Sequence, residues 1–153
     1  MKVFLDTNIF VEFISRRKQY EQVCQIIDAI IGGEYEAFIS MGGLYTLTYI
    51  FERDLKKQEI HRPELTQRLR GYLAEVLNMA TMVSFSHTDA VECVYDEAFC
   101  DLEDSFQYRC ALENNCDVLV TINIKDYRQA GQADLEILTP TGFVEKYLHT
   151  KTK

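Results

Sequence analysis

Short apolar runs alternate with longer segments of helical periodicity along the chain. Each run is rich in Val, Ile, Leu and Phe and has no alternating polar face, which predicts strands buried on both sides of a sheet. These runs cover residues 3–5, 37–40, 82–85, 118–121 and 136–138. The segments between them space their apolar residues three or four apart, and predict helices over 7–15, 20–31, 43–55, 63–78, 88–99, 102–114 and 140–148.

Buried strands separated by helices are typical of a parallel sheet that carries helices on both faces. Because crossovers between parallel strands are right-handed, the sequence predicts an α/β fold: a three-layer α/β/α sandwich around a central, mostly parallel five-stranded sheet. We expect a single domain over residues 1–153, since no linker or repeat interrupts the pattern. In such folds the functional side chains collect at the carboxyl edge of the sheet, just after each strand.

Composition restricts the partners and the metals that we expect. The chain has 16 Lys and Arg against 24 Asp and Glu, a net charge of −8, so any contact with nucleic acid is local rather than spread over the surface. Five Cys without a CxxC pair, and three His, disfavour a zinc site and predict reduced thiols. No segment is long and apolar enough to span a bilayer, and Asp6 interrupts any signal-peptide core, so we expect a cytoplasmic protein without membrane contact.

The first group of polar residues, Asp6, Thr7 and Asn8, directly follows the first strand. Asp6 is therefore expected at the carboxyl edge of the sheet. All three residue types also cap helices well, so the same motif is explained as the start of the helix that follows. Thr7 and Asn8 either cap that helix or position a bound ligand or water.

A second acidic group opens the helix predicted over 102–114. Asp101 and Asp104 are three residues apart and share one helix face, with Glu103 beside them. Asp101 is also a good N-cap, and the helix dipole favours acids in a first turn, so a purely structural role stays open. The predicted buried stripe of this helix consists of Leu102, Phe106 and Cys110. Asp104 borders that stripe.

A third polar group, Thr121, Asn123 and Asp126, follows the fourth predicted strand. A turn and a helix cap would explain these residues as well. Acids from three strand or helix ends would nevertheless meet at one edge of the sheet, where they repel one another unless a cation compensates them. Lys125 and the basic turn over residues 16–18 are candidates for that compensation, and a divalent metal provides it better. Because all-oxygen ligands select a hard ion, the sequence predicts a site for Mg²⁺ or Mn²⁺.

Four segments together resemble a PIN domain, and they cover nearly the whole chain in the same order. They are KVFLDTNIFVEF, AFIS with the helix after it, DLEDSFQYRCALENNCDVLVTINIKDY, and LEILTPTGFVEKYL. The combination of DLED with TINIKDY is specific, whereas DTN alone is not. The sequence looks most like the bacterial branch close to the toxins of virulence-associated toxin–antitoxin pairs.

The resemblance implies an endoribonuclease that hydrolyses RNA with a water activated by Mg²⁺ or Mn²⁺. The catalytic residues that it implies are Asp6, Asp101, Asp104 and Asn123. The metal ligands that it implies are Asp6, Asp101, Glu103, Asp104 and Asp126. We expect substrate contacts from Thr7, Asn8, Thr121 and the basic turn formed by Arg16, Arg17 and Lys18. That turn is also explained as solvated surface.

Partners other than RNA follow from the same branch of the family. The resemblance implies an antitoxin protein, and it leaves a homodimer open. The helices predicted over 20–31 and 43–55 are rich in apolar residues. These residues either pack into the chain's own core or offer a face to an antitoxin or a second copy.

One position departs from the family pattern. PIN domains usually carry a Glu about two turns after the residue that matches Ser40, and here that position falls near Thr46. The next acid is Glu52, which replaces it only if the helix is displaced by more than a turn. The missing carboxylate and the acidic charge support a second hypothesis, in which a PIN fold with weakened or no cleavage serves as a binding module. Mn²⁺ binding that depends on Asp6 distinguishes the two.

Overall fold

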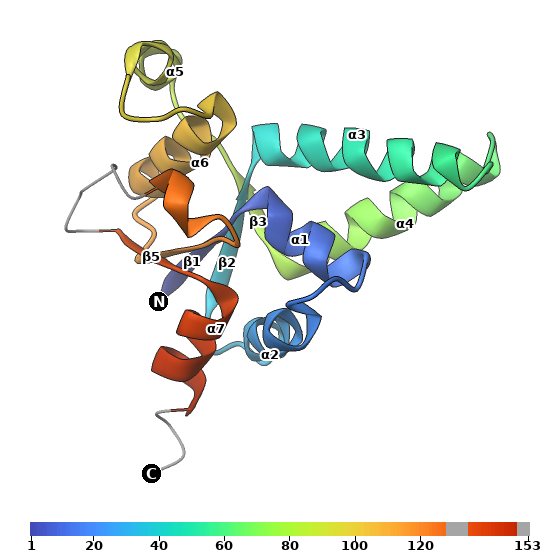
Figure 1. Cartoon of the computed structure of the whole chain (residues 1–153), viewed down its shortest axis with the longest axis horizontal. Coiled ribbons are helices and arrows are strands. Elements are labelled where there is room, and N and C mark those ends of the chain that lie inside the picture. The colour runs from blue at the N-terminus through green and yellow to red at the C-terminus, as the bar shows by residue number, and fades with distance from the viewer. Residues whose placement is uncertain (128–134, 150–153) are drawn as a thin grey trace.

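A five-stranded sheet forms the centre of the molecule (Figure 1). The computed structural model describes residues 1–127 and 135–149. The strands are β1 (Lys2–Leu5), β2 (Glu36–Ser40), β3 (Thr81–Val83), β4 (Val118–Val120) and β5 (Glu136–Leu138). They lie in the order β3-β2-β1-β4-β5, and each pairs with its neighbour in parallel. The predicted α/β fold with a five-stranded parallel sheet is confirmed.

The helices lie close to their predicted ranges. They are α1 (Thr7–Ile14), α2 (Tyr20–Ile31), α3 (Met41–Lys57), α4 (Glu64–Met79), α5 (His87–Tyr95), α6 (Leu102–Glu113) and α7 (Pro140–Phe143). A 3-10 helix, η1 (Ile124–Tyr127), follows β4, and a π-helical segment, η2 (Val144–Leu148), continues α7. The largest difference concerns α5, which ends four residues before the predicted position 99. It ends there because Asp96 takes an extended conformation and its carboxylate accepts a hydrogen bond from the Ala98 amide at 2.9 Å. No helix in the described ranges is long and apolar enough to cross a membrane.

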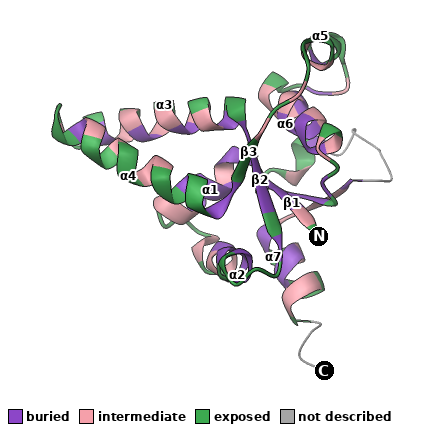
Figure 2. Ribbon diagram, turned by 180° about the vertical axis from the view of Figure 1, so that it is seen from behind, coloured by how far each residue is buried: buried purple, intermediate pink, exposed green. Residues whose placement is uncertain are grey.

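Alternate residues of each strand point to opposite faces of the sheet and divide the core into two layers. Val3 and Leu5 belong to a cluster that includes residues of α1, α2, α3, α4 and α7. Phe4, between them, belongs to a second cluster that includes residues of α6. All three side chains are fully buried, and helices cover both faces of the sheet (Figure 2). This is why β1, β2 and β4 are continuously apolar. The predicted burial on both sides is wrong for β3, which is largely exposed, and for β5, which is half-buried, because each lies at an edge of the sheet.

Helices α3 and α4 form an antiparallel pair that projects away from the sheet (Figures 1 and 2). Phe51 and Tyr72 pack between them, with ring centroids 5.5 Å apart. Gly43 lies where the first turn of α3 passes the start of α1. A Cβ atom there would lie 3.0 Å from the Ser40 hydroxyl and 3.2 Å from the Thr7 hydroxyl. The missing side chain therefore lets α3 begin beside the carboxyl edge of the sheet.

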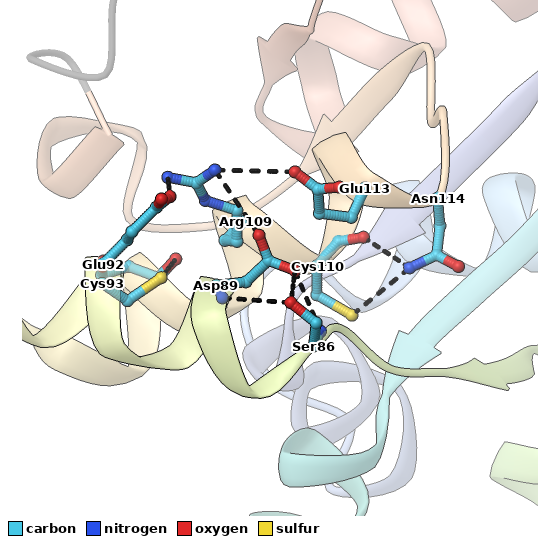
Figure 3. A network of polar contacts seen from close by, with 9 residues as sticks. Ser86, Asp89, Glu92, Cys93, Arg109, Cys110, Glu113 and Asn114 are labelled. Carbon is cyan, nitrogen blue, oxygen red and sulfur yellow. Dashed lines mark hydrogen bonds and ion pairs between the residues drawn. The ribbon is translucent and has the colours of Figure 1, made fainter.

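One arginine fastens α5 to α6 (Figure 3). The guanidinium of Arg109 on α6 lies 3.1 Å from Glu92 and 3.8 Å from Asp89, both on α5, and 3.5 Å from Glu113 on its own helix. Asp89 also forms a capping box with Ser86, whose hydroxyl accepts a hydrogen bond from the Asp89 amide at 3.1 Å. These contacts fix the start of α5 against α6.

Candidate active site

Asp6 lies between β1 and α1, and its side chain is almost completely buried (3% exposed). Its carboxylate accepts hydrogen bonds from the Thr121 hydroxyl at 2.7 Å and from the Gln107 side-chain amide at 3.1 Å. It also accepts a hydrogen bond from the Asn8 backbone amide at 3.4 Å, which makes it the N-cap of α1. Asp6 thus caps a helix and presents its carboxylate at the carboxyl edge of the sheet.

The hydroxyl of Tyr127 joins Asp6 to an acid of α6. It lies 3.1 Å from Oδ2 of Asp6 and 3.2 Å from Oδ1 of Asp104. Burial and the two carboxylates raise the pKa of Tyr127 far above its ordinary value, so the hydroxyl keeps its proton. It can donate that proton to only one carboxylate at a time. Both contacts are hydrogen bonds only when one of the two acids also carries a proton.

The pKa values of Asp6 and Asp104 are both raised. Burial, followed by the charges of Asp6 and Asp101, raises the pKa of Asp104 to about 7, although the hydrogen bond from Tyr127 opposes the rise. The charge of Asp126 adds to it. Burial also raises the pKa of Asp6, despite the hydrogen bonds that it accepts. The paired acids therefore bind protons more tightly than ordinary carboxylates.

Glu103 joins this acidic group through its contacts with α1 and α3. The Thr7 hydroxyl donates to Glu103 at 3.2 Å, and the Thr46 side chain also hydrogen-bonds to it. Burial raises the pKa of Glu103, and these two hydrogen bonds partly offset the rise. Among the described residues, no Lys or Arg forms an ion pair with Asp6, Glu103 or Asp104. A bound cation would stabilise such a group of uncompensated acids.

These side chains open into a cleft of about 270 Å³, which we call the acidic cleft. The predicted site residues that line it are Asp6, Thr7, Asn8, Arg17, Asp101, Glu103 and Asp104. The structure thus brings together residues that come from the end of β1, the basic turn after α1, and the start of α6. Arg53 of α3 adds a second basic side chain to the lining.

Three further predicted residues lie next to the acidic cleft without lining it. Thr121 is fully buried and donates to Asp6, and its hydroxyl accepts a hydrogen bond from the Asn123 amide at 3.1 Å. Asn123 and Asp126 are exposed. Asp126 affects the cleft through its charge, which contributes to the raised pKa of Asp104.

The three residues of the basic turn after α1 differ in whether they reach the acidic cleft. Arg17 lines the acidic cleft. The guanidinium of Arg16 instead lies over the Tyr20 ring, 5.6 Å from its centroid, and Lys18 is exposed outside the cleft lining. Of the three basic residues, only Arg17 is part of the cleft, and substrate contacts from Arg16 and Lys18 stay a prediction.

Asp101 is the N-cap of α6. One of its carboxylate oxygens accepts hydrogen bonds from the backbone amides of Glu103 at 2.8 Å and Asp104 at 3.3 Å. The capping alternative is confirmed for this residue, although its side chain also lines the acidic cleft. The cap fixes the first turn of α6, and with it the backbone that carries the two acids.

Thr46 lines the acidic cleft, whereas Glu52 does not. Glu52 forms ion pairs with Lys56 at 3.0 Å and Arg62 at 3.1 Å, and the Lys56 hydrogen bond and charge, together with Arg62, lower its pKa. Glu52 therefore does not supply the carboxylate that is missing near Thr46.

Sequence reasoning missed Gln107, which positions Asp6. Gln107 is buried (2% exposed), its side-chain amide donates to Asp6, and its side-chain oxygen accepts from the Thr7 backbone amide at 3.0 Å. It also missed the bridging role of Tyr127. The signal for Gln107 was its spacing: it follows Asp104 by three residues and Glu103 by four, so it shares their helix face.

The predicted buried stripe of α6 is wrong. Leu102 is 48% exposed and Phe106 is only partly buried, whereas Cys110 is buried as expected. The residues that α6 buries are Ser105, Gln107, Tyr108, Cys110 and Ala111. Polar residues belong to this set because the helix face against the sheet also carries the contacts to Asp6. Phe106 packs on Phe85 instead, with ring centroids 6.0 Å apart.

The donor set fits a hard ion with an open coordination shell. In the described part of the chain, no three His, Cys, Asp or Glu side chains are gathered closely enough to hold a metal by themselves. Mg²⁺ does not need such a cage, since it keeps several waters and is bound through one or two carboxylates and the phosphates of a substrate. Asp6 and Asp104, both within hydrogen-bond distance of one hydroxyl, meet that smaller requirement.

Comparison with known proteins places the chain in a family. A family model described as PIN domain matches residues 2–125. The chain is 24% identical over 151 residues to Ribonuclease VapC1 of Aquifex aeolicus (strain VF5), with 95% of each protein covered. Its fold is similar to a chain of VapBC2 from Rickettsia felis bound to a DNA fragment from their promoter, with a TM-score of 0.65, 19% identity and coverage of 91% of this chain and 98% of that one. A chain of VapBC-1 from nontypeable Haemophilus influenzae has a TM-score of 0.58 and 15% identity, over 92% and 99% of the two chains. This chain belongs to the PIN domain family.

Proposed function

We propose that this protein is an endoribonuclease that depends on Mg²⁺ or Mn²⁺ and cleaves RNA in the acidic cleft. The observation that carries the proposal is the contact of Asp6 and Asp104 with the single hydroxyl of Tyr127. Holding two acids so close, with raised pKa values, destabilises the metal-free protein, and a divalent cation would reverse that cost. RNA as the substrate is supported by the name of the relative from Aquifex aeolicus.

Asp6 and Asp104 would hold the ion, with Glu103 and Asp101 nearby in the same cleft. A bound ion supplies charge stabilisation for a phosphate and a lowered pKa for a water molecule. Thr121 and Gln107 fix the orientation of the Asp6 carboxylate, which keeps its oxygens directed at the cleft. No side-chain nucleophile is required for such a hydrolysis.

The two basic side chains of the cleft lining have a different task. Arg17 and Arg53 lie in the same cleft as the acids, where their charges attract the phosphate backbone of an RNA strand. The molecule as a whole is strongly negative, with a net charge of −8. We therefore expect phosphate binding to be local, at these two side chains.

The test is cleavage of a fluorogenic single-stranded RNA with Mn²⁺ and with EDTA. We expect Asp6→Asn and Asp104→Asn to abolish Mn²⁺-dependent cleavage and to remove Mn²⁺ binding in a calorimetric titration. Asp28→Asn makes the same chemical change on the exposed face of α2 and is the matched control. Full activity in both cleft variants would overturn the proposal. Absence of Mn²⁺ binding in the unaltered protein would favour the binding-module hypothesis.

We also propose that the protein acts in the cytoplasm as the toxin of a toxin–antitoxin pair. The similarity to chains of two VapBC structures supports this partner class. Co-expression with the product of the adjacent gene tests it. The expected result is a complex in which RNA cleavage is suppressed, and sedimentation of the free chain decides whether it forms a homodimer. A neighbouring product that neither binds nor inhibits would contradict the proposal.

A further inference from the structure

A second hollow, of about 530 Å³, adjoins the acidic cleft. The two share Thr46, Glu103 and Gln107, so they lie on either side of a common wall. The remaining lining comes from the start of α3, from the segment between β3 and α5, and from α5 and α6. We call it the apolar hollow and define it by Tyr45, Phe85, His87, Ala90 and Phe106, together with the three shared residues.

Aromatic side chains give the apolar hollow its character. Phe85 and Phe106 stack with an interplanar angle of 19°. Tyr45, from α3, is 67% exposed and is available to a bound molecule. Ser86 and His87 add polar groups to an otherwise apolar lining. An apolar hollow of this volume with a few polar groups is typical of a site for a small organic group.

We propose that the apolar hollow binds one unpaired nucleobase of the RNA strand whose phosphate lies in the acidic cleft. The inference rests on the proposed function and specifies its substrate as single-stranded at this point. Single-stranded RNA is recognised chiefly through unstacked bases that stack on aromatic rings. The shared lining places the hollow directly beside the acids, within reach of the base of a nucleotide whose phosphate lies in the acidic cleft.

The charge of the protein supports a nucleobase as the ligand of the apolar hollow. With a net charge of −8 and two basic side chains in the acidic cleft, the protein gains little affinity from the RNA backbone. Stacking of a base on an aromatic ring is neutral, and each stacked base contributes appreciably to binding whatever its sequence. The apolar hollow supplies the contact that the charges do not.

The side of the apolar hollow that α5 forms is held in position by contacts within the protein. Arg109 fastens α5 to α6, and Ser86 caps the first turn of α5 (Figure 3). Ser86, His87 and Ala90, which line the hollow, all lie at or near that turn. Binding a base therefore requires little ordering of this segment, and the entropic cost of binding is small.

The experiment uses the full chain and 2-aminopurine riboside, a neutral nucleoside whose fluorescence is quenched when it stacks on aromatic rings. The expected result is saturable quenching in metal-free buffer. Tyr45→Ala and Phe85→Leu should weaken it by roughly 5- to 150-fold, as expected for the loss of one base–aromatic stack. Tyr49→Ala is the matched control, because Tyr49 is as exposed as Tyr45 (66%), lies one turn further along α3 and does not line the hollow.

A second arm measures cleavage of the fluorogenic RNA. Tyr45→Ala should raise KM by a similar factor with kcat little changed, and Asp6→Asn should lose cleavage while it retains quenching. Quenching that is absent, or unaffected by Tyr45→Ala, overturns the inference even if Asp6-dependent cleavage is intact. Quenching without cleavage supports the base site and refutes the proposed ribonuclease. If Tyr45→Ala alters only the sedimenting mass, the hollow is a protein interface and the inference is wrong.

Discussion

Removing the hydroxyl of Tyr127 tests whether it holds the two acids together. Tyr127→Phe keeps the buried ring and deletes only the oxygen that lies 3.1 Å from Asp6 and 3.2 Å from Asp104. Asp6 keeps its hydrogen bonds from Thr121 and Gln107, so the change acts mainly on the link between the acids. A buried hydrogen bond to a charged group contributes about 1.5–3 kcal/mol. At about 2–4 °C per kcal/mol, the metal-free melting temperature should fall by roughly 3–12 °C.

The same variant should bind Mn²⁺ more weakly. The Tyr127 hydrogen bonds lower the pKa of both acids, so their loss makes protons compete better with the ion. Loss of a residue that orients metal ligands costs about 10- to 100-fold in affinity. Calorimetry at pH 7 measures this, and Tyr147→Phe is the matched control, because its hydroxyl donates to Glu136 at 2.6 Å away from the cleft. Unchanged Mn²⁺ affinity in Tyr127→Phe would refute the reasoning.

Three further predictions concern charge in the acidic cleft. In a thermal-shift assay at pH 8, Asp104→Asn should raise the metal-free melting temperature, because it removes a charge that repels Asp6. The same variant should no longer be stabilised by Mn²⁺. A lower metal-free melting temperature would contradict the repulsion between the acids. The pKa of Asp104 is about 7 in the folded protein against an ordinary 3.8, so the folded state keeps a proton that the unfolded chain releases. The contribution of Asp104 to metal-free stability should therefore be fully present below about pH 4 and should fall until about pH 7. The measurement is the difference in melting temperature between the unaltered protein and Asp104→Asn as a function of pH. A difference that does not change with pH would refute this prediction. With Arg17 and Arg53 as the basic lining, two phosphate contacts on a single strand predict a logarithmic salt slope of about −1.4 for RNA binding, which becomes about half as steep in Arg17→Gln.

The fold could be predicted because its signals are local. Continuously apolar runs between helical segments specify parallel strands, and the structure has five of them. Burial on both faces was predicted correctly only for the inner strands β1, β2 and β4. Boundaries were predicted less well where one side chain decides them. Asp96 ends α5 through a hydrogen bond to the Ala98 amide, and apolar spacing does not contain that information.

The site could be predicted only in part, because burial of a polar residue depends on partners from elsewhere in the chain. Asp6 was identified because strand ends in this fold meet at one edge of the sheet. Gln107 was not identified, since the stripe from Leu102 to Cys110 suggested a different buried face. The side-chain amide of Gln107 is stable in the core because it donates to Asp6 and accepts from the backbone amide and the hydroxyl of Thr7. Neither partner is near it in the sequence.

The departure at Thr46 has a physical consequence for the acidic cleft. A Glu at this position would add a carboxylate beside Glu103, whose pKa burial already raises. Thr46 instead hydrogen-bonds to Glu103 and, like Thr7, favours its charged form. The exchange removes one potential ligand and lowers the repulsion among those that remain. The ion that we propose would therefore have few protein ligands, chiefly Asp6 and Asp104, and would keep positions free for water and a substrate phosphate. Because Thr46 lines both the acidic cleft and the apolar hollow, a residue shorter than Glu at this position leaves more room in both.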